Sequence, residues 1–204
     1  MKILKRVLLV VLVLVVLFLL IGLFLPSRYR VERSVVVRAK PAAIYGQISN
    51  FKNWLQWTAW NQTKYPDMQV RFDGPETGVG SGYSWEGKST GQGSIKFSRV
   101  EPDKGIWYDL DFERGKYKST GAITLEQAGD RIKVTWSNEG DLGGNPVNRY
   151  FGLMMDKMIG PDFEEGLAKL KEIAEAGTRW PHCLQCGAAA TQGTRFVIAV
   201  QPLN

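Results

Sequence analysis

The side chains best suited to nucleophilic or metal chemistry gather near the C-terminus. The chain of 204 residues has one histidine, His182, and two cysteines, Cys183 and Cys186. These three are crowded together, whereas a structural zinc site takes four ligands. We expect residues 178–204 to form a poorly ordered extension, and a zinc site or a local disulfide are the alternatives. A Ser-His or Cys-His pair is excluded for residues 1–181, because they contain neither histidine nor cysteine.

Carboxylates and tyrosines remain as candidates for acid-base chemistry. Strand-like alternation places the acidic side chains opposite the aromatic ones, where we expect water to solvate them. These carboxylates are Glu86, Asp109, Asp111 and Glu113. Tyr83 or Tyr108 is suited to polarising a carbonyl group. No G-x-x-x-x-G-K phosphate loop is present, so the sequence predicts no cofactor, no metal and no committed catalytic residue.

Residues 7–25 contain no charged or polar side chain. As a helix rising about 1.5 Å per residue they extend about 28 Å, close to the ~30 Å hydrocarbon core of a bilayer. A cleaved signal peptide has a shorter apolar region followed by small residues, whereas this run ends in Leu23-Phe24-Leu25-Pro26. We therefore expect an uncleaved single-pass transmembrane helix, with a signal peptide as the alternative.

The net charge of +6 is concentrated around this apolar run. Residues 1–40 hold eight Lys and Arg and one acid, whereas residues 41–204 hold eighteen Lys and Arg and nineteen Asp and Glu. The expected partners of the basic flanks are membrane lipids with anionic headgroups, and nucleic acid is not expected. The basic tail of residues 1–6 favours the inner side of the membrane. We therefore expect the soluble domain on the outer side, periplasmic or extracellular.

The part after the anchor has the size of one domain. Alternating apolar residues predict a strand at 31–38, and Pro41 suits the first turn of a short helix. Trp54-x-x-Trp57-x-x-Trp60 indicates a second short helix or a turn. Six alternating segments joined by short turns follow between residues 68 and 136. A long helix from Pro146 to Gly177 is predicted from its apolar stripe, and we expect Gly160-Pro161 to kink or break it. The stripe runs through Val147, Tyr150, Phe151, Met154 and Met158 and continues through Phe163, Leu167, Leu170 and Ala174.

This order of elements resembles the helix-grip fold of the SRPBCC or START-like superfamily. The resemblance includes A-x-P-x-x-I-Y-x-x-I from Ala39, the tryptophan triplet, Tyr83-x-Trp85-x-Gly87 and Gly166-Leu167-x-x-Leu170. The polyketide cyclase/dehydrase and lipid-transport type is most similar, particularly its membrane-anchored bacterial members. The resemblance implies an α+β domain at 31–177, in which a curved antiparallel sheet of about seven strands surrounds the long C-terminal helix.

The resemblance further implies a cavity between sheet and helix that binds a hydrophobic small molecule or lipid. A mostly apolar lining suits such a ligand. The candidate lining residues are Phe72, Tyr83, Trp85, Phe97, Tyr108, Leu110, Phe112, Trp136, Tyr150, Phe151, Met154 and Met158. We expect a membrane-anchored binding module rather than an enzyme. A cyclase or dehydratase using a pocket tyrosine or carboxylate, and a non-catalytic envelope interaction protein with a solid core, are the alternatives.

Overall fold

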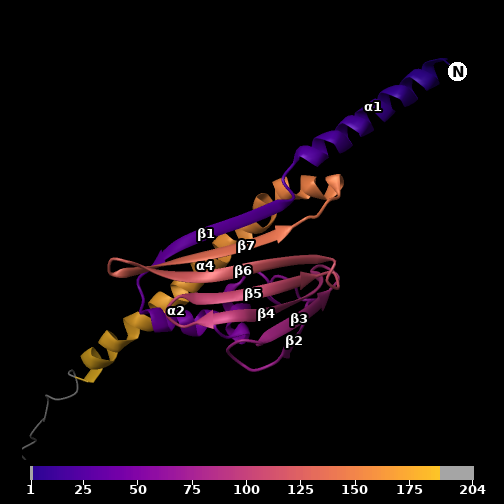
Figure 1. Ribbon diagram of the computed structural model, residues 1–204. Coiled ribbons are helices and arrows are strands. Elements are labelled where there is room, and N and C mark those ends of the chain that lie inside the picture. Colours follow the sequence, from indigo (N-terminus) through magenta and orange to yellow (C-terminus); the bar gives the residue numbers. More distant parts are fainter. Residues whose placement is uncertain (1, 189–204) are drawn as a thin grey trace, which may run out of the picture.

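A single antiparallel sheet forms the body of the protein, and helices lie against one of its faces (Figure 1). The computed structural model describes residues 2–188, with side-chain surroundings for residues 3–177. The sheet has seven strands in the order β1-β7-β6-β5-β4-β3-β2. The strands are β1 (Arg28–Val37), β2 (Gln69–Asp73), β3 (Gly82–Gly87), β4 (Gly91–Glu101), β5 (Gly105–Phe112), β6 (Tyr117–Ala128) and β7 (Arg131–Asp141). The helices are α1 (Lys2–Phe24), α2 (Pro41–Ile48), α3 (Phe51–Trp57) and α4 (Pro146–Ala188).

This arrangement confirms the predicted α+β helix-grip fold. Every strand and both short helices expected from the sequence are present. Alternation gives each strand an apolar side, and the register aligns these sides: Val35 lies opposite Val134, which lies opposite Leu125. The face they share, which we call the inner face, is covered by α2, α3 and part of α4.

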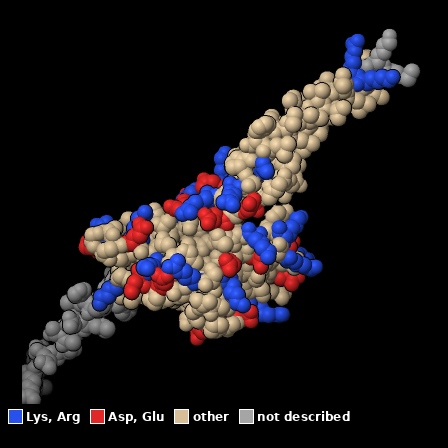
Figure 2. Space-filling view, viewed as in Figure 1, with Lys and Arg blue, Asp and Glu red and all other residues tan. Residues whose placement is uncertain are grey.

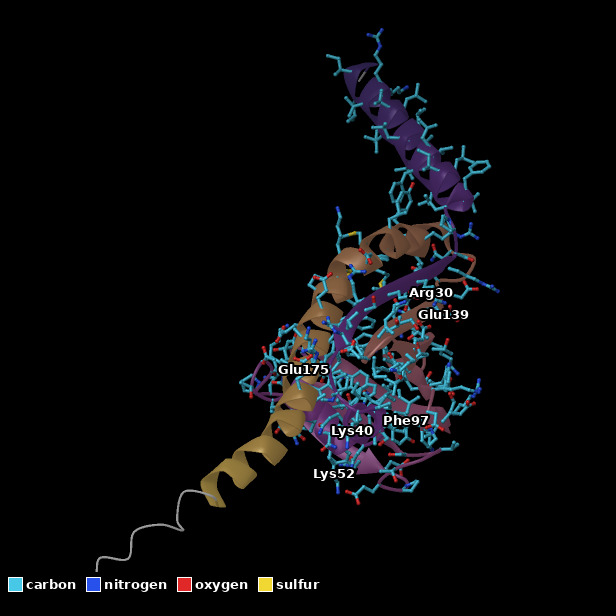
Figure 3. The ribbon with its side chains drawn as sticks, turned by 90° about the vertical axis from the view of Figure 1, so that its left-hand side faces the viewer. Arg30, Lys40, Lys52, Phe97, Glu139 and Glu175 are labelled. Carbon is cyan, nitrogen blue, oxygen red and sulfur yellow. The ribbon has the colours of Figure 1, made fainter. Side chains whose placement is uncertain are left out.

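Helix α4 is continuous from Pro146 to Ala188, so it extends past the predicted end at Gly177. In Figure 3 its first turns run across the base of α1 before the helix turns down along the sheet, and the helix is not broken at Gly160-Pro161. A bend is expected there, because proline cannot donate the helical hydrogen bond. Residues 189–204 lie outside the description, as do the side chains of His182, Cys183 and Cys186.

The predicted apolar stripe of α4 is wrong in register. In the first turns, the side chains that pack on the inner face are Met155 and Ile159, not Met154 and Met158, whereas the predicted Phe163 is buried. The bend explains the error, because the apolar residues of the first turns occupy more than one side of the helix and periodicity alone does not identify the side that meets the sheet. Beyond the bend the predicted Leu167, Leu170 and Ala174 are buried.

One arginine joins β1 to α4 at this bend. The Arg33 guanidinium donates to Asp156 Oδ1 at 2.8 Å and to Glu164 Oε1 at 2.6 Å. These carboxylates raise the pKa of Arg33, and Arg33 in turn lowers the pKa of Asp156. Gly160 lies beneath the guanidinium and leaves room for it. The contact fixes α4 against the edge strand rather than across the middle of the sheet.

Helix α1 projects from the body as a long rod with few charged atoms (Figure 2). The segment Ile3–Phe24 is long and apolar enough to cross a membrane, a property that signal sequences share. The base of α1 contacts α4: Phe18 and Tyr150 stack with ring centroids 4.2 Å apart. The Arg149 guanidinium also donates to Leu23 O at 2.6 Å. The apolar helix is thus held at a defined angle to the start of α4.

Candidate functional site

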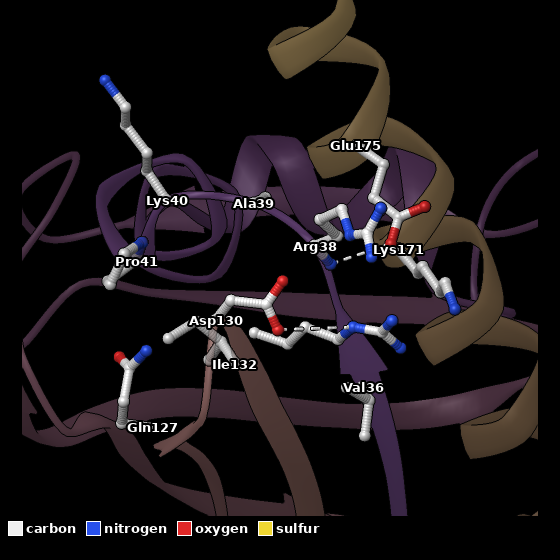
Figure 4. A pocket seen from close by; sticks show the side chains of 11 residues that line it. Val36, Arg38, Ala39, Lys40, Pro41, Gln127, Asp130, Ile132, Lys171 and Glu175 are labelled. Carbon is white, nitrogen blue, oxygen red and sulfur yellow. Dashed lines mark hydrogen bonds and ion pairs between the residues drawn. The ribbon is translucent and has the colours of Figure 1, made fainter.

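Two of the hollows on the described part of the surface have defined linings, and neither of these two lies between the inner face and α4. The larger, about 850 Å³, lies at the end of the sheet away from α1 (Figure 4). Its rim is charged: Arg38 N donates to Glu175 Oε1 at 2.8 Å, and Asp130 pairs with Arg131. The second, about 550 Å³, lies on the outer face, and Tyr108 is the one predicted lining residue that borders either hollow. Neither matches the apolar cavity expected from the sequence.

The middle of the inner face is filled by aromatic side chains. Phe51 of α3 stacks on Phe97 at 4.0 Å between ring centroids, and Phe163 of α4 stacks on Trp136 at 4.1 Å. Trp54 fits between them with its edge toward Trp136. Stacked and edge-to-face pairs of this kind add to the energy of burial. Three predicted lining residues, Phe97, Tyr108 and Trp136, are therefore buried in a packed core, as Tyr83 nearly is.

Closer to α1, the packing on the inner face becomes looser. Trp85, Leu110 and Phe112 are half-buried, and Phe72 beside them is exposed. We call these four residues the open end. They come from β2, β3 and β5, and all were predicted as lining residues. Helix α3 packs on the neighbouring part of the sheet, where Phe51 contacts Tyr83 and Phe97. Trp85 and Leu110 pack against the edge of this core and remain partly exposed.

A cluster of polar side chains borders the open end. Tyr29 Oη donates to Asn138 Oδ1 at 3.2 Å, and Asn138 Nδ2 donates to Ser119 Oγ at 3.1 Å. Trp136 Nε1 donates to Tyr108 Oη at 2.9 Å. Ser119 lies directly opposite Leu110 in the strand register, so the polar cluster and the open end adjoin. An apolar surface with a few placed polar groups is the usual composition of a small-molecule site.

Burial keeps the tyrosines of this region neutral. Desolvation raises the pKa of Tyr108 to about 12, against the opposing effect of hydrogen bonds from Trp136 and Asn138. Desolvation also raises the pKa of Tyr29 and of Tyr83. These hydroxyls are therefore hydrogen-bonding groups at neutral pH, and none is a ready base.

The carboxylates lie away from this cluster. Glu86 and Asp109 are exposed on the outer side of their strands, as the alternation predicts, and Glu113 lies in the turn after β5. Among residues 2–188 no group of three His, Cys, Asp or Glu side chains could hold a metal ion. The Glu113 carboxylate lies beside the Phe112 ring, because a Cβ at Gly91 would lie 2.7 Å from Glu113 Oε1 and 3.0 Å from Phe112 Cζ.

Four predicted lining residues lie elsewhere. Tyr150 packs on α1, and Phe151, Met154 and Met158 are exposed on the first turns of α4. The sequence interpretation in turn missed residues that border the open end. These are Tyr29, Ser119 and Asn138, which carry polar atoms. Strand periodicity could have indicated Tyr29 and Asn138, because each continues the inward alternation of its strand.

Comparison with known proteins agrees with this architecture. Residues 28–175 match the family model described as polyketide cyclase / dehydrase and lipid transport. A search of the curated proteins finds no match. The di-domain ARO/CYC StfQ of the steffimycin biosynthetic pathway is 9% identical, with a TM-score of 0.57 over 74% of this chain and 52% of that one.

Two further solved structures share the fold. A hypothetical protein of Helicobacter pylori, jhp0584, is 9% identical with a TM-score of 0.55 over 73% of this chain and 89% of that one. DynU16, a putative protein of the dynemicin biosynthetic locus, is 14% identical with a TM-score of 0.51 over 72% of this chain and 48% of that one. At such identities the likeness establishes the fold alone.

Proposed function

Because this chain belongs to the polyketide cyclase/dehydrase and lipid-transport family, we propose that it binds a hydrophobic small molecule or lipid at the open end of the inner face. The observation that carries the proposal is the half-buried surface of Trp85, Leu110 and Phe112 beside the Tyr29–Asn138–Ser119 hydrogen bonds. An acyl chain or ring system would cover the apolar side chains. Its polar group would then meet the tyrosine and amide.

We further propose that α1 is an uncleaved single-pass anchor and that the domain lies on the outer side of the membrane. The contacts of α1 with the rest of the protein support an anchor over a removed signal. Gly22 packs so closely on Pro146 that a Cβ there would lie 2.7 Å from the Pro146 carbonyl oxygen. A segment destined for removal has no need of such a fitted contact with the mature domain.

A titration of the full chain in detergent micelles with a fluorescent fatty acid tests the binding proposal. We expect Phe112→Ala to weaken binding about fivefold, corresponding to about 1 kcal/mol of lost apolar contact. The matched control is Trp107→Ala, which removes a larger aromatic side chain from the same strand but on the outer face, where Trp107 packs under Arg99. Equal affinities of the two variants would count against the open end as the site.

Catalysis by a pocket tyrosine is a second candidate, favoured by the neutral hydroxyls of Tyr29 and Tyr108 next to Asn138. Such donors stabilise charge on a carbonyl oxygen when a ring closes. The test is incubation of the protein with a linear poly-ketone thioester and detection of cyclised product. Tyr29→Phe should abolish an enzymatic conversion and retain binding, whereas Tyr45→Phe on α2 should leave both unchanged. Conversion equal to that in buffer would remove this candidate.

A further inference from the structure

The first turns of α4 carry large apolar side chains that no described part of the protein covers. Phe151 is 53% exposed, Met154 54% and Met158 56%, and Val147 is 42% exposed. With spacings of four, three and four residues, these side chains follow one side of the helix. We call them the α4 stripe. It lies on a different side of the helix from Met155 and Ile159, which pack toward the sheet.

Contacts at the base of α1 fix the position of the α4 stripe along the axis of α1. Tyr150 stacks on Phe18, and its hydroxyl donates to Phe18 O at 2.7 Å. Phe18 precedes the end of α1 at Phe24 by six residues, or about 9 Å of helix. Arg149 donates to the carbonyl oxygens of Leu23 and Leu25, which holds the two helices together.

These contacts place the α4 stripe at the boundary of any bilayer that α1 crosses. We infer that the first turns of α4 lie in the membrane surface, with the α4 stripe among the lipid acyl chains and headgroups. This inference rests on the proposed anchoring by α1. The surface that we expect to cover the α4 stripe is that of a phospholipid bilayer. Helices that bind in this way bury their apolar side about 5–10 Å into the boundary region, and tyrosine is enriched at that depth.

The orientation and charge of this region fit the same surface. The first turns of α4 run across the base of α1 rather than along it (Figure 3). Cationic side chains accompany them: Lys157 is exposed on α4, and the Arg28 side chain at the start of β1 is 87% exposed, with its Nε 3.8 Å from Asp141 Oδ2. Both suit anionic headgroups.

The open end lies at the same end of the sheet. Tyr29 is one residue from the start of β1, and its cross-strand row continues through Gly140 and Ser119 to Leu110. A bilayer that meets the α4 stripe would therefore lie near the open end. A lipid-like ligand would then pass between membrane and site without crossing bulk water, and this route depends on the proposed binding function.

Depth-dependent quenching tests the inference in the full chain. Both native cysteines are first replaced (Cys183→Ser, Cys186→Ser). Single cysteines are then introduced into this variant, one per protein, and each is labelled with an environment-sensitive fluorophore. The protein is reconstituted into phosphatidylethanolamine–phosphatidylglycerol vesicles containing spin-labelled lipid. We expect the label at Met154→Cys to be quenched about threefold or more beyond the label at Ala168→Cys, because an interfacial helix lies within reach of the acyl chains. Ala168 is the matched control, exposed on α4 beyond the bend.

A third label, Val13→Cys in the middle of α1, separates this inference from the anchoring on which it rests. Strong quenching at residue 13 with weak quenching at residue 154 would overturn the inference and retain the anchor. Weak quenching at residue 13 would overturn both. A blue-shifted but unquenched label at residue 154 would show that protein, such as a second copy of this chain, covers the α4 stripe, and would also overturn the inference.

Discussion

Gly121 offers a sharp test of how the inner face is packed. A Cβ at this position would lie 2.6 Å from Tyr108 Cε2 and closer still to Cζ and the hydroxyl oxygen. Tyr108 is 2% exposed and accepts the hydrogen bond from Trp136 Nε1, so it has little room to move. Gly121→Ala should therefore displace the ring from its place in the core.

The expected cost has two parts. Overpacking a core by one methyl group typically costs about 1–3 kcal/mol. Leaving the buried Trp136 N–H without its acceptor costs about 1–3 kcal/mol more. We therefore expect the free energy of unfolding to fall by about 2–6 kcal/mol, a large fraction of a typical domain's stability of about 5–15 kcal/mol.

Urea denaturation followed by tryptophan fluorescence measures this change. The matched control is Gly46→Ala in α2, where nothing lies within 4 Å of the added Cβ. That substitution should be neutral or should stabilise by about 0.5–1 kcal/mol, because alanine is the better helix former. If Gly121→Ala is as stable as Gly46→Ala, the packing of Tyr108 described above is wrong.

A double-mutant cycle identifies the cause. Tyr108→Ala removes the ring that the new methyl group would meet. If steric overlap is the cause, Gly121→Ala should cost little in the Tyr108→Ala background, so the two effects should be less than additive. Additive effects would place the cost elsewhere, for example in the backbone of β6.

Three further predictions concern the polar groups. Asn138→Ala should lower the free energy of unfolding by about 1–3 kcal/mol, because Tyr29 loses its acceptor; urea titration checks this, and an unchanged midpoint would contradict it. Burial raises the pKa of Tyr108 to about 12, so the neutral phenol stabilises the fold below pH 10 and stability should fall as pH rises toward 12. Absorbance at alkaline pH checks this, and ionisation of Tyr108 near pH 10 without unfolding would refute it. Arg33 lowers the pKa of Asp156, so their contact stabilises the fold at neutral pH and is lost as pH falls below about 4; acid titrations of wild type and Asp156→Asn should differ there, and identical curves would exclude the contribution.

Strand alternation predicted the sheet because each strand has one buried and one exposed side. The positions of Leu110 and Phe112, against exposed Asp109, illustrate how reliable this period is at the level of single residues. Short helices were equally predictable, since Pro41 begins α2 and the tryptophans of α3 are buried. The fold was therefore largely specified by local pattern.

The candidate site was harder to predict for physical reasons. Periodicity identifies which residues face inward but not whether neighbouring rings fill the space, and Phe51 and Trp54 take up room that was expected to be a cavity. The direction of α4 depends on Pro161 and on the long-range contact of Arg33 with Asp156, neither of which a repeat pattern encodes. The Tyr29–Asn138 hydrogen bond joins residues far apart in sequence and has no local signal.

Photo-crosslinking tests the central claim most directly. The full chain, purified in detergent, is irradiated with a fatty acid bearing a diazirine, and the labelled residues are identified by peptide mass spectrometry. Binding at the open end predicts labels on Trp85, Leu110 or Phe112, and loss of these labels when excess unlabelled fatty acid is present. Labels found only in the charged hollow between Lys40 and Lys171, or only on the outer face, would contradict this claim. A complete absence of labels would contradict it as well.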